Sequence, residues 1–153
     1  MDSDRLAIYR ITDFITVLSI LDDPIIDGDI NEDGFRTPFP NVIDEFWIGI
    51  AELGSETFAC FRVHQLSRHV WQVHAFVLPS YRNKYSVIAA NMAKEWAWKN
   101  IPELKTLITV VPSCHPNVIY FVRKMGFKLV GKLENCYTKN KKVEDLLIFS
   151  TQE

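Results

Sequence analysis

Three apolar, strand-like runs follow one another in the middle of the chain, at residues 46–53, 57–66 and 69–78. The short polar linkers Gly54-Ser55 and Ser67-Arg68 have hairpin spacing, and such spacing favours antiparallel pairing of neighbouring strands. The sequence therefore predicts an antiparallel meander, and every other element has to pack against the sheet that this meander begins.

Alternating helical and strand-like segments surround the meander. Before it, residues 5–11 predict a strand and residues 13–21 a helix with Thr12 as its N-cap. After it come a helix at 85–99, a strand at 104–111, a helix at 116–125 and strands at 127–133 and 143–150. This order predicts an α/β domain of the α+β type, with a mixed, mainly antiparallel sheet of about seven strands flanked by helices.

The chain of 153 residues is long enough to bury a hydrophobic core without disulfide or metal, so we expect residues 1–153 to form a single domain. No apolar run approaches the roughly 20 residues of a membrane helix, and the acidic start has no features of a secretory signal. We expect a cytoplasmic protein that binds no membrane. The three cysteines show no metal-ligand spacing, and we predict no metal site.

Charge is unevenly distributed along the sequence. Residues 1–45 hold eleven acidic and three basic residues, whereas residues 46–153 hold eight acidic and fourteen basic ones. The basic part is suited to an anionic cofactor and the acidic part to a cationic substrate, although two solvated faces remain an open alternative. The low overall pI of about 6.1 and the lack of interleaved aromatic residues argue against nucleic-acid binding.

The most informative stretch runs from Val77 to Val87, where the third strand of the meander meets the next helix. The start of a helix presents free backbone N–H groups and the positive end of the helix dipole, which together bind phosphate groups. Arg82 and Lys84 add positive charge. A purely structural turn is the alternative reading of the same residues.

This stretch and the order of the elements resemble the Gcn5-related N-acetyltransferase (GNAT) superfamily. The family motif V-x-P-x-[YF]-[RQ]-x-[KR]-G-[IL]-G/A is matched in register by Val77, Pro79, Tyr81, Arg82 and Lys84. Lys124-Met125-Gly126-Phe127 is similar to the end of the family's closing helix. Tyr85 and Val87 replace the motif glycines, and in this the chain looks like small, glycine-poor members encoded by phages.

The resemblance implies an N-acetyltransferase that moves an acetyl group from acetyl-CoA, its cosubstrate, to an amine of a small molecule or protein. It implies that the Val77 backbone binds the pantetheine arm and that the next turn holds the phosphates. The predicted cofactor-binding residues are Val77, Arg82, Asn83, Lys84, Tyr85, Ser86 and Val87.

The catalytic groups are less clear from the sequence. Strand 69–78 has no carboxylate to serve as the family's general base, which leaves His74 as the candidate. The family's tyrosine acid falls on Val122, and only Tyr120 and Tyr137 lie near enough in sequence to replace it. A hydrogen-bonded structural histidine is the alternative for His74. A catalytically inactive binding or structural protein of the same fold is the alternative for the chain.

Two loops are expected to frame the acceptor site, namely 22–45 and 134–142, and the acidic first loop favours a cationic acceptor. Within it, residues 29–34 match the first half of a calcium-loop pattern, but the position of the closing glutamate is Pro40. The acceptor's identity and the oligomeric state stay open, with a homodimer among the alternatives.

Overall fold

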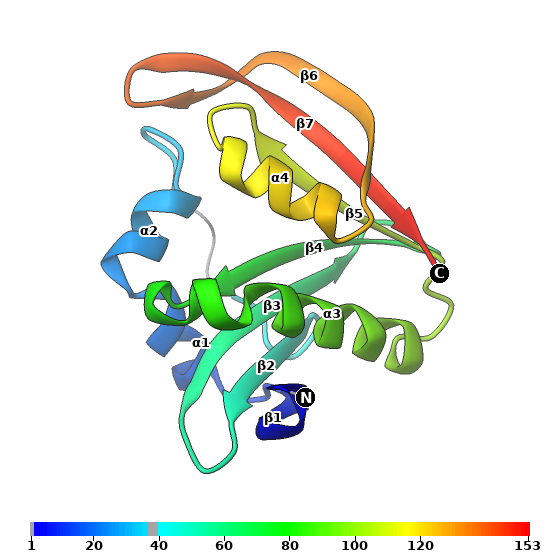
Figure 1. The fold of residues 1–153 in the computed structure, drawn as a ribbon. Helices are drawn as coiled ribbons and strands as arrows, with labels where there is room; N and C mark the ends of the chain where they lie inside the picture. Colours follow the sequence, from blue (N-terminus) through cyan, green and yellow to red (C-terminus); the bar gives the residue numbers. More distant parts are fainter. Residues whose placement is uncertain (1, 37–39) are drawn as a thin grey trace.

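The computed structural model describes residues 2–36 and 40–153. Seven strands form one sheet in the order β1-β2-β3-β4-β5-β7-β6 (Figure 1). Every neighbouring pair is antiparallel except β4 and β5, which run parallel. The expected mixed, mainly antiparallel sheet is confirmed. The strands are β1 (Leu6–Arg10), β2 (Phe46–Glu52), β3 (Thr57–Gln65), β4 (Val70–Val77), β5 (Thr106–Pro112), β6 (Lys128–Lys139) and β7 (Lys142–Gln152).

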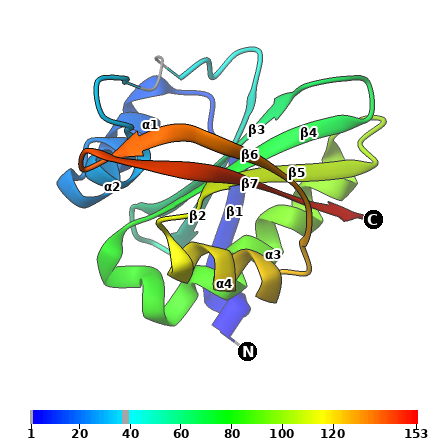
Figure 2. The same cartoon turned by 90° about the horizontal axis from the view of Figure 1, so that it is seen from above.

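Helices cover both faces of this sheet. Seen from above in Figure 2, α3 and α4 lie on one side of the strands, and α1 and α2 lie on the other. Two short 3-10 turns, η1 and η2, precede β1 and α3. The bounds are η1 (Asp2–Arg5), α1 (Phe14–Leu21), α2 (Pro24–Ile30), η2 (Pro79–Tyr81), α3 (Arg82–Asn100) and α4 (Pro116–Lys124). Among the described helices, none is both long and apolar enough to cross a membrane.

The helix starts differ from the sequence-based prediction. Asp13, and not Thr12, is the N-cap of α1, because its carboxylate accepts the Thr16 N–H at 2.7 Å. The segment from residue 22, where the sequence predicted a long loop with a short helix as an open alternative, contains the short helix α2, whose N-cap Asp23 accepts two backbone N–H groups. Helix α3 begins at Arg82, three residues earlier than expected, because η2 leads directly into its first turn.

Side-chain alternation along β3 and β4 divides the core into two parts. Odd-numbered residues such as Val63, Trp71 and Val77 pack with α3 and α4. On the other face, Cys60 and Phe76 pack with α1 and α2. Because side chains of a strand alternate between faces, His74 lies on the α1 and α2 face together with Phe76.

Gly49, in the middle of β2, is covered closely by its neighbours. A Cβ atom built on it would lie 2.9 Å from Ile11 Cγ1 and from two ring carbons of Tyr9. We predict that Gly49→Ala lowers the free energy of unfolding by about 1–3 kcal/mol, because the added methyl overpacks this site. Urea denaturation followed by circular dichroism measures the change.

The matched control is Gly28→Ala. Gly28 lies in α2, and a Cβ built there meets nothing within 4 Å, so alanine should stabilise the protein by roughly 0.5–1 kcal/mol through its better helix propensity. Equal stability of both variants would show that the packing around Gly49 is looser than the structure indicates.

Candidate functional site

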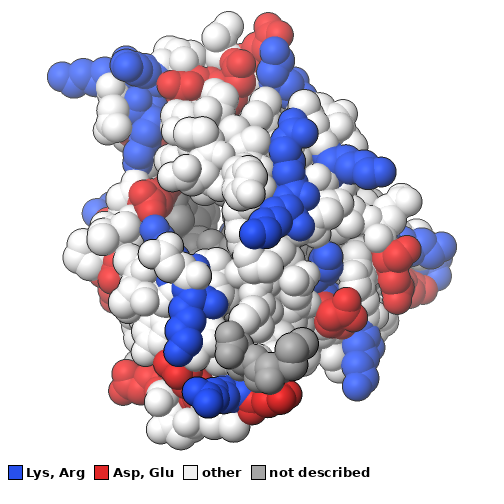
Figure 3. Space-filling model, viewed as in Figure 1, with Lys and Arg blue, Asp and Glu red and all other residues white. Residues whose placement is uncertain are grey.

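A cavity of about 1330 Å³ passes between the two halves of the sheet. Its walls come from β4 and β5 at the centre, from α1 and α2 on one side, and from α3 and α4 on the other. In Figure 3 the surface is hollowed between α2 and the first turns of α3 and α4, and Lys and Arg side chains lie over α4 beside the hollow. The two sides of the molecule are thus joined through the sheet.

The cavity exists because β4 and β5 pair over only three positions. Their register covers Val70–Gln72 of β4 and Thr106–Ile108 of β5, and beyond it the two strands diverge (Figure 1). The Leu78 N–H bonds the Phe58 carbonyl of β3 at 2.9 Å. By strand alternation, the peptide groups of Ala75 and Val77 therefore point away from β3, towards the opening between β4 and β5.

The start of α3 forms one wall of this cavity. Of the predicted cofactor-binding residues, Arg82, Asn83, Ser86, Val87 and the strand residue Val77 line it. The N-cap residue of α3 offers no side-chain acceptor, and the first turn contains no acidic residue. The helix therefore directs the positive end of its dipole at the cavity with no acidic side chain to neutralise it, while the Arg82 N–H bonds the Pro79 carbonyl of η2.

Tyr85 and Lys84 are placed differently from the other predicted residues. The Tyr85 ring is buried, with 1 % of its surface exposed, and its hydroxyl donates to Glu52 at 3.2 Å. The Lys84 ammonium lies 4.9 Å from the centre of that ring. Tyr85, at a motif glycine position, thus packs into the core and is not among the residues that line the cavity.

Arg82 holds the end of β4 in place. Its Nε donates to the Val77 carbonyl at 2.9 Å, and a terminal nitrogen lies 3.5 Å from an Asp29 carboxylate oxygen. The same guanidinium that the sequence assigns to phosphate thus also connects the strand end with α2. The Arg82 side chain is half-buried and lines the cavity.

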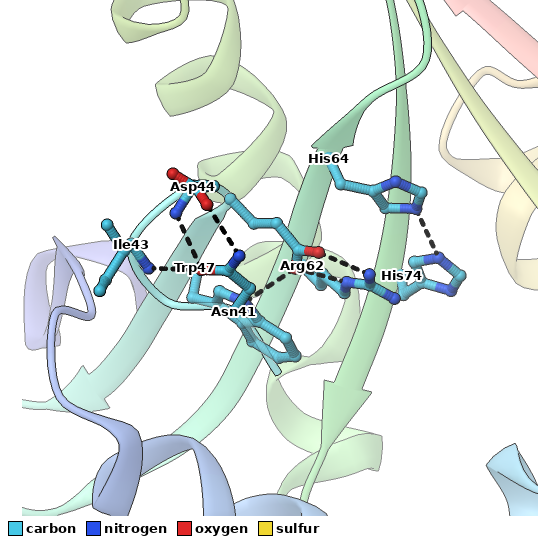
Figure 4. A network of polar contacts seen from close by, with 8 residues as sticks. Asn41, Ile43, Asp44, Trp47, Arg62, His64 and His74 are labelled. Carbon is cyan, nitrogen blue, oxygen red and sulfur yellow. Dashed lines mark hydrogen bonds and ion pairs between the residues drawn. The ribbon is translucent and has the colours of Figure 1, made fainter. Parts of the chain in front are cut away.

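A polar network lies on the opposite side of the strands (Figure 4). Glu45 accepts two hydrogen bonds from Arg62, at 2.7 and 2.6 Å, and one from the Trp47 indole. Next to this ion pair, the Nε2 atoms of His64 and His74 lie 3.2 Å apart. Of the two histidines, His74 lines the cavity. The sequence analysis did not identify Arg62 and Glu45. The available signal was an arginine within an apolar central strand, because such an arginine commonly forms a bidentate pair with a carboxylate.

Burial dominates the protonation of this network. Burial, and then the Arg62 charge and His64, lower the pKa of His74 to about 4. The pKa of His64 is lowered by burial and by Arg62 as well. Burial alone would raise the pKa of Glu45, but the Arg62 hydrogen bonds and charge lower it overall. At neutral pH His64 and His74 are therefore both uncharged. His74 is a much weaker base than the sequence suggested.

The three positions considered for a general acid differ in their exposure and in their surroundings. Val122 is packed in the core, 7 % exposed, and Tyr120 is 70 % exposed near the cavity mouth. Tyr137 lines the cavity, and burial, followed by Cys114 and Glu32, raises the pKa of its phenol. Tyr137 therefore keeps its proton at neutral pH. His115 also lines the cavity, and its buried Nε2 has no hydrogen-bond partner among the described residues.

The acidic segment 28–33 and the β6–β7 hairpin close over the cavity, and they lie side by side in Figures 1 and 2. Asp33 accepts the N–H groups of Asn140 and Lys141, and Glu32 accepts that of Thr138. Lys139 donates in return to backbone carbonyls of the segment. Asn140 and Lys141 both have positive φ, a backbone conformation that costs non-glycine residues free energy. The hydrogen bonds that their N–H groups donate to the Asp33 carboxylate offset this free-energy cost. The residues of the calcium-like pattern are thus used within the chain.

Comparison with known families matches this architecture. The family model described as "Protein of unknown function (DUF2824)" matches residues 11–152. The chain belongs to this family. A comparison with curated proteins gave no match.

Solved structures show the same fold. A protein from Acinetobacter baylyi ADP1, provisionally assigned as an acetyltransferase, superimposes with a TM-score of 0.78 at 14 % identity, covering 97 % of this chain and 92 % of that one. A Vibrio cholerae spermidine N-acetyltransferase in complex with CoA and spermine gives a TM-score of 0.78 at 12 % identity, covering 97 % and 96 %. A dodecameric structure of that enzyme gives 0.77 at 12 %, covering 97 % and 94 %. The GNAT fold is confirmed.

The low pKa of His74 predicts how stability depends on pH. Its folded pKa lies below the unfolded value of about 6.5, so the unfolded state binds more protons between about pH 6.5 and 4. Stability should therefore be fully present above pH 6.5 and fall by on the order of 3 kcal/mol towards pH 4. His74→Gln should flatten this slope in urea denaturation at several pH values. An unchanged slope would contradict the assignment.

Asp33 predicts a local effect at the hairpin. Hydrogen bonds from Lys141 and Asn140 lower the pKa of Asp33, so its contribution is present above the unfolded pKa of about 3.9 and is lost as the pH falls through the folded value. Asp33→Asn should speed amide hydrogen exchange at Asn140 and Lys141. Asp29→Asn is the matched control, because Asp29 contacts Arg82 and not the hairpin, and it should leave that exchange unchanged.

Proposed function

We propose that this chain is an N-acetyltransferase that uses acetyl-CoA and acetylates an amine. The observation that supports this function best is the passage through the sheet between β4 and β5. On one side it meets the uncapped start of α3, and on the other it meets His74. Two substrates can therefore reach one point from opposite faces of the sheet, as direct transfer between them requires.

The residues present fit acetyl-CoA. The cavity is larger than most small-molecule sites, which hold about 300–1,000 Å³, and has room for a cofactor and an acceptor together. The inward Tyr85 leaves the first turn of α3 open to phosphate, and Val87 adds apolar surface. The peptide groups of Ala75 and the N–H of Val77 face the opening and can bond an extended amide arm, whereas the Val77 carbonyl is bonded by Arg82.

Each side of the site has a separate chemical task. Acetyl-CoA supplies the activated acetyl group as a thioester. The N–H groups along the end of β4 orient its carbonyl and stabilise developing negative charge. His74, neutral at the cavity wall, accepts a hydrogen bond from the amine and passes its proton on to solvent. Tyr137, which keeps its own proton, is a proton donor at the same cavity.

A non-catalytic protein of the same fold is the second candidate. It is favoured by the core position of Val122 and by the weak basicity of His74. The two candidates differ in one measurement, because only the enzyme releases CoA thiol in the presence of an amine. CoA binding without thiol release would support the second candidate.

Binding of acetyl-CoA is the direct test of the proposed site. Titration calorimetry with the wild-type chain should show one site. Arg82→Ala should weaken binding by about tenfold, since it removes a positive charge on the cavity wall. Lys84→Ala should have a smaller effect in the same direction, because its ammonium lies over the Tyr85 ring and Lys84 is not among the cavity residues. Lys99→Ala is the matched control, because Lys99 is an exposed lysine in the last turn of the same helix, and it should leave the affinity unchanged.

The role of His74 is separable from cofactor binding. His74→Gln should keep the acetyl-CoA affinity and lower the rate of acetyl transfer by about tenfold, which corresponds to one hydrogen bond to the amine. For the binding test, two outcomes would place the cofactor elsewhere. One is an equal loss of acetyl-CoA affinity in Arg82→Ala, Lys84→Ala and Lys99→Ala, and the other is an unchanged affinity in all three.

A further inference from the structure

The acceptor side of the cavity is mainly apolar. Its wall on the α1 and α2 side is formed by Leu18, Leu21, Ile25, Phe35, Trp47 and Phe76. Trp47 and Phe76 stack at the base, with ring centres 6.1 Å apart. Ile25 and Phe35 are 53 % and 61 % exposed. Both belong to the same apolar wall, and a contiguous exposed apolar surface is typical of a site for an apolar partner.

The carboxylates around this wall are already used within the chain. Asp27 accepts a hydrogen bond from Asn31, Asp29 lies within ion-pair distance of Arg82, and Glu32 accepts the Thr138 N–H. Of the described residues that line the cavity, Asp22 is a further acidic one, and it is exposed at the end of α1. Arg36, Arg62 and Arg82 line the same cavity, so the carboxylates contributed by residues 1–45 face positive charges there.

The polar end of the pocket disfavours positive charge. The ion pair of Arg62 with Glu45 lies next to His74, and the two histidines are stacked with ring centres 5.4 Å apart. The groups that face His74 are thus one guanidinium, the carboxylate that neutralises it, and a second neutral imidazole. The same burial and the same Arg62 charge that keep the His74 ring unprotonated act on any ammonium ion placed beside it.

From the apolar wall and the carboxylates that are hydrogen-bonded or ion-paired within the chain, we infer that the acceptor is a monoamine on an aromatic or other apolar group, bound in its uncharged form. This inference rests on the proposed acetyl transfer. The amine nitrogen lies towards His74 and the gap between β4 and β5, and the apolar group lies between α1, α2 and the Trp47 and Phe76 rings.

Binding the amine uncharged removes the need for a strong general base. Only the free amine has the electron pair that attacks a thioester carbonyl. When the C–N bond forms and the C–S bond breaks, the thiolate leaves with the electron pair of the latter bond, and the extra proton on nitrogen passes through His74 or directly to solvent. A polycation loses several solvated charges on entering such a pocket and gains no carboxylate in return.

Three amines test the inference on the intact chain with acetyl-CoA. Benzylamine and 4-methylaniline carry one amine on a ring, and spermidine is a polycation. We expect kcat/KM for both ring amines to exceed that for spermidine by about tenfold or more, measured by release of CoA thiol. An equal or higher value for spermidine overturns the inference and still supports the proposed function.

The remaining outcomes also separate the two proposals. Bound acetyl-CoA without transfer to either ring amine contradicts the acceptor class and leaves the cofactor site standing. A chain that neither binds acetyl-CoA nor acetylates any of the three amines contradicts the proposed function itself.

A charge placed in the apolar wall provides a second test. Ile25→Asp adds a carboxylate at an exposed position near the start of α2, where acidic residues are favourable. It should lower the ratio of kcat/KM for benzylamine to that for spermidine by about fivefold. Ile15→Asp is the matched control, because Ile15 is 78 % exposed on α1 and is not among the cavity residues, and the ratio should stay as in the wild type. An unchanged ratio in Ile25→Asp overturns the placement of the acceptor.

Discussion

The parting of β4 from β5 is the constraint on which the rest of this structure depends. Two parallel neighbours that pair over three residues leave the peptide groups of both strand ends without a ladder partner in the sheet, and backbone polar groups need partners. Arg82 supplies one of them by donating to the Val77 carbonyl. On its other side, β5 is secured by seven register positions with β7. The strands are thus paired continuously on either side of the opening, and the sheet is open between β4 and β5.

This opening determines how charge is used on the two faces. On the α3 side, the first helical turn is left without a cap or an acid, which preserves its attraction for phosphate. On the α1 and α2 side, several charged groups have partners within the chain: Glu45 is paired with Arg62 and Asp29 with Arg82, and Asp33 and Glu32 accept hairpin N–H groups. A surface that is acidic by composition therefore encloses a pocket of low charge. Net charge over a segment is a poor guide to a site when the charges have partners in the fold.

The candidate site was predicted in part. Of the predicted cofactor-binding residues, Val77, Arg82, Asn83, Ser86 and Val87 line the cavity and Lys84 and Tyr85 do not. The strand-to-helix junction that carries them is a local feature that the sequence records directly. Tyr85 could not be placed in the same way. Its inward packing against Phe58 and its bond to Glu52 involve strands about 30 residues away in the chain. Arg62, Glu45 and His64 were missed for the same reason, since their pattern appears only when β2, β3 and β4 lie side by side.

The sequence by itself determined the order of helices and strands, the meander and the strand-to-helix turn, because these follow from periodicity, turn residues and propensity over short windows. Only the tertiary structure decided the chemistry of His74. An isolated histidine in a strand has an ordinary pKa, and its value of about 4 arises from burial and from the charge of Arg62, a residue of the neighbouring strand. Likewise, the carboxylates of Asp33 and Glu32 became hairpin ligands through contacts spanning more than 100 residues. The pKa of a side chain depends on which charges lie near it in space, and the sequence gives only the separation of residues along the chain.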